Sequence, residues 1–170
     1  MAVEPDPVMA EEARRRAAPF PQVRVVNAAV SKQAGTVTLY QNPVDPRHNS
    51  LWRENVPVET CPSVRVPAVT LDELAAQVPR LHVIKIDAQG AEADILRGAT
   101  ETLQRDDLVW FVELWAEGLR HAGSSVHDVA CLFAEAGWQP ANLPWVKVVE
   151  LAERKTNHGA IDVIVQKRAA

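Results

Sequence analysis

The sequence predicts an α/β fold with a doubly wound, mostly parallel sheet and helices on both of its faces. Apolar runs of strand length alternate with amphipathic helical stretches, a pattern typical of βαβ units. The clearest unit is residues 82–99, HVIKIDAQGAEADILRGA, in which an apolar strand ends at Asp87 and a glycine turn leads into a helix. With 170 residues, 47% of them apolar, the chain is expected to form one domain with a substantial core.

The first two predicted elements are a short strand and a helix. A very short strand is expected at residues 1–4. Asp6 followed by Pro7 is typical of a helix start, because aspartate caps free backbone N–H groups and proline fits the first turn. The helix is expected to run to about Ala18, since Pro19 cannot continue it.

The next part of the chain is predicted to hold three strands around one long loop. Strands are expected at 23–30 and 36–40, and the short connection between them, which ends in Gly35, indicates a hairpin. Residues 41–63 are rich in proline and asparagine and lack periodicity, so they are expected to be irregular, as functional loops often are. A third strand is expected at 64–69.

The second half of the chain continues the alternation of helices and strands. A capping box that begins at Thr70 predicts a short helix, and the apolar residues at every fourth position from Ala91 to Leu103 predict a buried helical stripe. Ser125 is expected to cap a further helix that ends at Gly137. Strands are expected at 108–115, 138–142 and 161–166, the last two on either side of a polar turn at 153–159.

Composition and charge exclude several classes of partner. The formal net charge of −4 gives no electrostatic basis for binding nucleic acid or an anionic membrane. No apolar stretch approaches the ~20 residues that span a bilayer, and no signal peptide is recognisable. Cys61 and Cys131 lack metal-ligand spacing, so we expect structural thiols, a cytoplasmic location and no metal site.

Three acidic residues, Glu4, Asp87 and Glu113, stand at the ends of predicted strands. In a parallel sheet these ends meet at one edge, where ligands of open α/β sheets bind. Charged groups beside a buried sheet are costly unless they are paired or contact a polar ligand. Each acid could instead be a helix cap or an ion-pair partner, as Lys85 could be for Asp87. Taken together, the three acids indicate a ligand site.

Several segments resemble one family. KIDAQGAEADILRGA at 85–99 resembles the signature K-[IV]-D-V-E-G-A-E-x-x-[VI]-L-x-G-A of FkbM-type methyltransferases. Segments that resemble other parts of that family's pattern occur in the same order along about residues 2–115; they are VEPDP at 3–7, VNAAVS at 26–31, VTLDEL at 69–74 and FVEL at 111–114.

The resemblance implies a class I methyltransferase fold, which is Rossmann-like, and S-adenosylmethionine as cofactor. The methyl acceptor would be a hydroxyl of a small metabolite or saccharide. By resemblance, Glu4 would hold the ribose hydroxyls of the cofactor, and Asp87 would contact the cofactor where it faces the methyl-transfer site. Asn27 and Ala28 would lie near the adenine. The resemblance does not identify the acceptor or the oligomeric state.

Methylation of a hydroxyl requires that the oxygen be aligned with the methyl group and that its proton be removed. Asp87 is the first candidate for the base, because it follows a buried strand directly. Glu92, Glu113 and His121 are the other candidates for a catalytic role.

The chain departs from the family pattern in two ways. Gln89 stands where the family usually has an acid, and no glycine precedes Gly35, so the glycine turn after the first strand is not found. We therefore expect a domain over 1–170 that lacks the first βα unit, with an open slot between the strands ending at Glu4 and Asp87. A non-catalytic remnant or binding module is the alternative, followed by an unrelated α/β sugar- or nucleotide-modifying enzyme.

Overall fold

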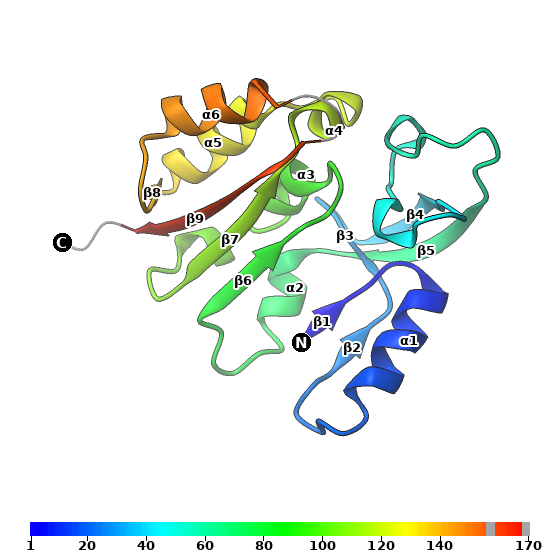
Figure 1. The fold of residues 1–170 in the computed structure, drawn as a ribbon. Helices are drawn as coiled ribbons and strands as arrows, with labels where there is room; N and C mark the ends of the chain where they lie inside the picture. Colours follow the sequence, from blue (N-terminus) through cyan, green and yellow to red (C-terminus); the bar gives the residue numbers. More distant parts are fainter. Residues whose placement is uncertain (156–158, 168–170) are drawn as a thin grey trace.

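The computed structural model describes residues 1–155 and 159–167 and has the predicted mixture of helices and strands (Figure 1). The elements, in chain order and with η for a short 3-10 helix, are β1 (Ala2–Val3), α1 (Pro7–Ala17), β2 (Val25–Val26), β3 (Ala29–Val30), β4 (Gly35–Tyr40), η1 (Pro46–His48), η2 (Arg53–Asn55), β5 (Ser63–Val69), α2 (Leu71–Ala75), β6 (Val83–Ile86), α3 (Glu92–Arg97), η3 (Thr102–Gln104), β7 (Val109–Leu114), α4 (Ala116–His121), α5 (Val126–Glu135), β8 (Trp138–Pro140), α6 (Trp145–Glu153) and β9 (Ile161–Lys167). The α/β class is thus confirmed.

The strands form three small sheets rather than the one predicted sheet. Strands β1 and β2 form a parallel pair, and β5 lies between β3 and β4. The largest sheet has the order β6-β7-β9-β8, in which only β6 and β7 are parallel. A single, mostly parallel sheet is therefore not found, because β9 returns antiparallel between β7 and β8.

Only one face of the largest sheet is covered by helices of the described residues. Side chains alternate between buried and more exposed along β6, β7 and β9, as expected for a sheet with one covered face. Val83, Val109 and Ile164 are among the exposed apolar residues of these strands. The prediction of helices on both faces is thus not confirmed for this sheet in the described part of the chain.

The predicted hairpin between 23–30 and 36–40 is also wrong. Its first strand is interrupted after β2, because the Asn27 side chain donates to the carbonyl oxygens of Glu4 and Pro5 and turns the chain there. Strand β4 instead pairs antiparallel with β5, which is long enough to match it from end to end. Residues 41–62 connect these two strands, and η1 and η2 interrupt their irregular course.

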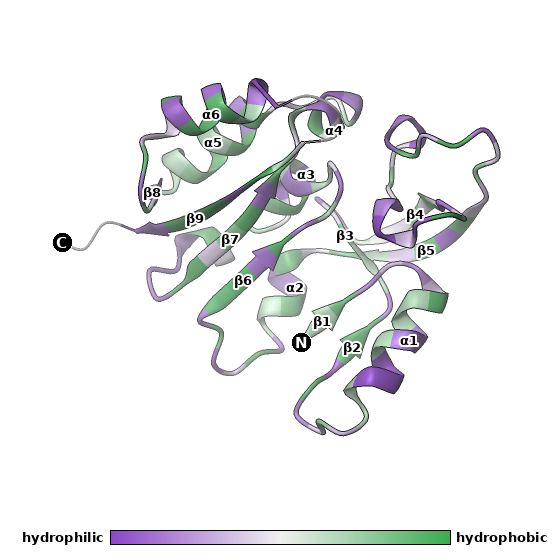
Figure 2. Ribbon diagram, viewed as in Figure 1, coloured by the Kyte–Doolittle hydropathy of each residue, from purple (hydrophilic) through white to green (hydrophobic). Residues whose placement is uncertain are grey.

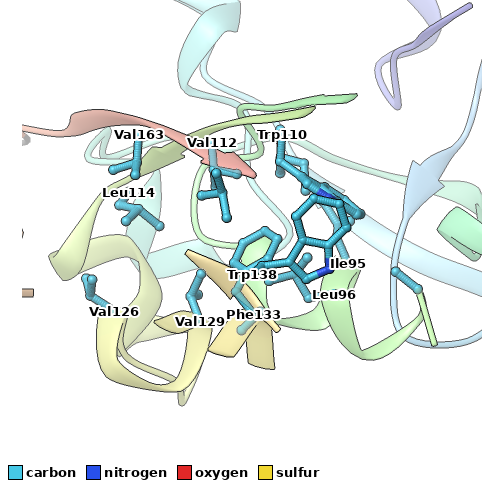
Figure 3. Packing of buried hydrophobic residues seen from close by; sticks show 14 of the residues in the cluster. Ile95, Leu96, Trp110, Val112, Leu114, Val126, Val129, Phe133, Trp138 and Val163 are labelled. Carbon is cyan, nitrogen blue, oxygen red and sulfur yellow. The ribbon is translucent and has the colours of Figure 1, made fainter. Parts of the chain in front are cut away.

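The main core lies between the largest sheet and the helices α3, α5 and α6. Trp110 of β7 is fully buried and meets Phe133 and Trp138 edge to face, with ring centroids 5.4 and 5.8 Å apart (Figure 3). In Figure 2, β6 and β7 are coloured mainly as hydrophobic. The predicted stripe is confirmed, since its four members, Ala91, Ile95, Ala99 and Leu103, are all buried.

The helical segment that carries this stripe is shorter than predicted. Helix α3 ends at Arg97, and a 3-10 turn at Thr102–Gln104 follows. At Gly98 a Cβ atom would lie 2.4 Å from the carbonyl oxygen of Ser31, so this close approach requires glycine. Two helices, α4 and α6, have no counterpart in the predictions, and neither has a side-chain cap at its start. Of the turn predicted at 153–159, residues 156–158 lie outside the described part.

An apolar trough of about 390 Å³ separates β1 from β6. Its walls come from both strands and from the α2 region; they include Met1, Val3, Leu71, Leu74, Val78, Val83, Ile84 and Ile86. Strand β1 is hydrogen-bonded to β2 only and β6 to β7 only, so the trough runs between two open strand edges. The expected slot is thus present, and no strand of the described residues fills it. No helix in this part of the chain is both long and apolar enough to cross a bilayer.

Candidate active site

A cavity of about 180 Å³ lies where β1, β3 and β6 end (hereafter the cavity). Its walls include Glu4 from the end of β1, Ala28 from the β2–β3 junction, and Asp87 and Gln89 from the turn after β6. Three of the four residues predicted to contact a cofactor therefore line one small space. The fourth, Asn27, does not line it.

Glu4 presents a half-buried carboxylate to the cavity. Its Oε1 accepts a hydrogen bond of 2.8 Å from the backbone N–H of Asp6, which fixes the side chain across the start of α1. Burial raises the pKa of Glu4, and the bond from Asp6 lowers it only in part. No partner of Oε2 is found among the described residues, so this oxygen is available to a ligand that donates hydrogen bonds.

Asn27 acts on the cavity indirectly. Its Nδ2 donates to the carbonyl oxygens of Glu4 and Pro5, both at 2.9 Å. These bonds hold the end of β1 against the β2–β3 junction and so set the distance between Glu4 and the peptide at Ala28.

Asp87 and Glu113 form a hydrogen-bonded pair at the ends of the neighbouring parallel strands β6 and β7. The bond to Asp87, followed by burial and the nearby negative charges, raises the pKa of Glu113 to about 8. The same bond, assisted by Lys85, lowers the pKa of Asp87. Near neutral pH the pair therefore holds one proton, and the lowered pKa of Asp87 and the raised pKa of Glu113 favour the ionised form of Asp87.

Two further side chains orient the Asp87 carboxylate. Lys85 Nζ lies 2.9 Å from Oδ2, and Gln89 Nε2 donates to Oδ1 at 3.2 Å. The ion pair with Lys85 considered in the sequence is thus present, and it coexists with exposure of Asp87 to the cavity. Gln89, which replaces the acid of the family pattern, supplies a donor to Asp87 at this position.

Glu92 is buried at the start of α3, directly after the turn that follows β6, and does not line the cavity. Its Oε1 accepts from the backbone N–H groups of Ala88 and Gly90, at 3.0 and 3.2 Å. Oε2 has no hydrogen-bond partner among the described residues. Burial raises the pKa of this carboxyl to about 7. Glu92 is therefore placed to shape the turn that carries Asp87 rather than to meet a substrate.

The same turn is held from outside by Asn55 of η2. Its Nδ2 donates to the carbonyl oxygens of Gln89 and Gly118, at 2.9 and 3.2 Å. The backbone at Gly90 has φ 101°, and a Cβ there would lie 2.6 Å from the oxygen of Gly118. His121 meets Asn55 through Nδ1 and Oδ1 at 2.6 Å, so this candidate base lies behind the turn and does not line the cavity.

The loop before η2 contributes residues that sequence reasoning missed. Arg47 and Asn49 line the cavity, and Asn49 donates to Oδ2 of Asp6 at 2.9 Å. These residues lie in a segment without periodicity, where only its richness in asparagine and proline indicated a function. Asn49 depends on a hydrogen bond to a residue far away in the sequence, whereas Arg47 is held by its near neighbour Asp45.

Comparison with known proteins identifies the family. The sequence profile described as methyltransferase FkbM domain matches residues 1–139. The chain belongs to the FkbM methyltransferase domain family. It is also 36% identical over 81 residues to the hexuronic acid methyltransferase AglP of Haloferax volcanii, a match that covers 46% of this chain and 31% of that relative. The chain thus aligns with about a third of the relative's length. No solved structure matches.

The wall of the cavity carries groups that would suit the nucleoside half of a methyltransferase cofactor. Glu4 offers a carboxylate for a ribose diol, and Ala28 contributes a small residue to the wall that a purine would contact. At about 180 Å³ the cavity is smaller than the ~300 Å³ at which ligand pockets usually begin. It adjoins the trough, with which it shares Val3, Val30, Asp87, Ala88 and Ile95. The trough is mainly apolar, so it offers few partners to the charged methionine half.

Proposed function

We propose that this domain transfers a methyl group from S-adenosylmethionine to a hydroxyl group of a saccharide. Membership of the FkbM family supports the reaction class, and the relative that acts on a hexuronic acid supports a saccharide acceptor. The observation that carries the proposal is that Glu4, Ala28 and Asp87 line one cavity. A free thiol at both Cys61 and Cys131 supports a reducing, cytoplasmic location.

The roles of the residues follow from their positions. Oε2 of Glu4 would accept hydrogen bonds from the ribose hydroxyls, and the backbone at Ala28 would contact the adenine. The cofactor, when bound, supplies an electrophilic methyl group. Asp87 is ionised and held by Lys85, so it can accept a hydrogen bond from the acceptor hydroxyl and orient its oxygen.

Proton transfer would use the pair that Asp87 forms with Glu113. The acceptor oxygen would bond to the methyl carbon as the carbon–sulfur bond of the cofactor breaks, S-adenosylhomocysteine would leave, and the hydroxyl proton would pass to Asp87. Lys85 stabilises the negative charge of the pair before the transfer, and its 2.9 Å contact fixes the direction of the carboxylate. Glu113 acts through Asp87, since it does not line the cavity.

The class I arrangement of the fold is part of the proposal. Strands β1 and β6 each run parallel to their one neighbour and leave the other edge open toward the trough. One further parallel strand in the trough would join the two sheets and bring their carboxyl ends to a common edge.

A binding module without catalysis is the second candidate function. The mainly apolar trough favours it, because a zwitterionic methionine group would find few polar partners there. This candidate predicts that the cavity binds nucleosides but supports no methyl transfer.

Binding of S-adenosylhomocysteine, measured by calorimetry and by ligand-observed NMR, tests the proposed cofactor site. We expect detectable but weak binding by the wild-type chain, and about tenfold weaker binding by Glu4→Gln because a ribose acceptor loses its charge. Glu11→Gln, at an exposed glutamate of α1, is the matched control and should bind as the wild type does. Equal affinity of the Glu4→Gln variant and the wild type would contradict the proposal.

A further inference from the structure

Arg47 is the one cationic side chain among the described residues that line the cavity. The other charged members of the wall are Glu4 and Asp87, both of which repel an anionic ligand. In the proposed function these acids serve the ribose and the acceptor hydroxyl. A negatively charged part of a substrate would therefore have to bind beside Arg47.

The guanidinium of Arg47 is held in place by Asp45 but keeps hydrogen-bond donors that have no partner among the described residues. Asp45 accepts from Nε at 2.9 Å and from Nη2 at 2.8 Å, and its Oδ1 also caps the backbone N–H of Arg47. No partner of Nη1 is found within residues 1–155 and 159–167, so its two N–H groups remain free. The bidentate grip thus leaves one edge of the planar group available for an oxyanion.

Stability does not account for this pair. The Arg47 side chain is 86% exposed, and exposed ion pairs contribute little to folding. The loop around the pair is nevertheless well ordered by hydrogen bonds: Asn42 Oδ1 accepts from the N–H groups of Val44 and Asp45. Asn49 accepts from Asn42 N and donates to Asp6. Because Asp6 also binds the Glu4 side chain through its N–H, Arg47 is held in a defined position relative to Glu4.

We propose that Arg47 is a specificity-determining residue that selects a methyl acceptor with an anionic group, through the free N–H groups of Nη1. The proposal rests on the proposed function and narrows its acceptor to an acidic saccharide. A carboxylate suits this site best, because its two oxygens match the planar donors of a guanidinium. The carboxylate of the cofactor is the other possible source of such a group, and the experiment distinguishes the two.

The test compares p-nitrophenyl β-D-glucuronide with p-nitrophenyl β-D-glucoside, which differ in a carboxylate against a hydroxymethyl group. Methyl transfer and saturation-transfer NMR binding are measured for both probes. The wild type should prefer the glucuronide, and Arg47→Ala should lower its kcat/KM by about tenfold or more without affecting the glucoside. Arg47→Lys should retain part of the preference for the glucuronide, because lysine keeps the positive charge but lacks the planar pair of N–H donors of a guanidinium.

Two further variants sharpen the result. Arg105→Ala is the matched control: Arg105 is gripped by Asp107 through the same two nitrogens, at 2.9 and 2.8 Å, and does not line the cavity. It should behave as the wild type does. Asp45→Asn keeps the oxygen that caps η1 but removes the competing charge, so it should bind the glucuronide more tightly.

The outcomes separate the two proposals. Equal losses on both probes in Arg47→Ala, or no preference in the wild type, would overturn the role of Arg47. Weaker binding of S-adenosylhomocysteine by Arg47→Ala would assign Arg47 to the cofactor and also overturn it. Glucuronide binding that depends on Arg47, without methyl transfer, would support the anion site and refute the proposed function. Neither binding nor transfer of any probe would overturn both.

Discussion

The two walls of the cavity are built by different means. The Asp87 wall belongs to the largest sheet, whose core holds the tryptophan cluster around Trp110, and its turn is locked by buried polar groups. The Glu4 wall belongs to a two-stranded sheet and a loop, and side-chain hydrogen bonds near the surface hold it together. The two walls therefore have different roles. The first wall provides stability and a rigid reacting group, and the second provides recognition.

Core truncation should reveal this difference most strongly. Trp110→Ala removes a fully buried ring from the main core and should lower the free energy of unfolding by about 4 kcal/mol. Leu39 of β4 lies in the small second core and lines the cavity from outside the largest sheet, and Leu39→Ala should cost nearer ~2 kcal/mol because fewer buried residues surround it. Urea denaturation followed by circular dichroism measures both. An equal or greater cost of Leu39→Ala would refute the comparison.

Glu92 should make the stability of the Asp87 wall depend on pH. Burial raises the pKa of its carboxyl from 4.5 to about 7, so the folded state keeps a proton that the unfolded state has released. This contribution is complete below about pH 4.5 and is lost as pH rises through 7. The loss in the free energy of unfolding is at most about 3 kcal/mol.

The matched variant is Glu92→Gln, which cannot ionise. Between about pH 5 and 8 the wild type should lose more stability than Glu92→Gln. Glu113 titrates in both proteins, and its contribution differs between them only through its repulsion by the charge of Glu92, the last of the causes that raise its pKa. Parallel pH profiles of the two proteins in urea titrations would show that Glu92 is not the titrating group.

A single added Cβ atom at Gly90 should destabilise the turn that follows β6. Gly90→Ala places a Cβ at φ 101°, 2.6 Å from the oxygen of Gly118 and 2.7 Å from Asn55 Nδ2, and should cost about 2 kcal/mol or more. Gly123→Ala is the control, since its φ is also positive, at 71°, but no atom lies within 4 Å of the added Cβ. Its cost should be about 1 kcal/mol. Similar melting temperatures for the two variants would contradict the locked turn.

The smallest expected effect is on self-association through the trough. Open strand edges and exposed apolar side chains favour pairing with another chain. Val83→Lys, at a residue 62% exposed beside the trough, should therefore reduce self-association in light-scattering measurements. Val44→Lys, at a residue 84% exposed in the long loop, should not. Equal effects would mean that general surface hydrophobicity drives the association.

The Asp87 wall is also the part that the sequence predicts best. Strand β6, its turn and α3 follow each other within one short segment, so apolar periodicity and the glycine turn report them directly. The grouping of Glu4 with Asp87 follows from strand ends alone. The helix that carries the stripe is nevertheless shorter than predicted, because Gly98 packs against the backbone of Ser31, a contact no local pattern reveals.

The Glu4 wall is predicted less well, for a physical reason. Asn49 reaches its place through a hydrogen bond to Asp6, which is distant in the sequence, and Arg47 lies in the loop that this bond anchors. On the other wall, Asn55 binds Gln89 and Gly118, which are equally remote from it in the sequence. The break between β2 and β3 likewise depends on one side chain that binds the end of β1. Hydrogen bonds between residues that are distant in the sequence produce no periodic pattern from which they could be predicted.

The central claim is that Asp87 acts at the reacting centre of a methyl-transfer site. Transfer of a labelled methyl group to p-nitrophenyl β-D-glucuronide, measured beside S-adenosylhomocysteine binding, tests it most directly in Asp87→Asn. We predict a rate lowered by about 100-fold or more, with cofactor affinity nearly unchanged, and wild-type behaviour in Asp107→Asn, which alters only an exposed ion pair. Undiminished turnover in Asp87→Asn would contradict the claim and would leave Asp87 as the structural partner of Lys85.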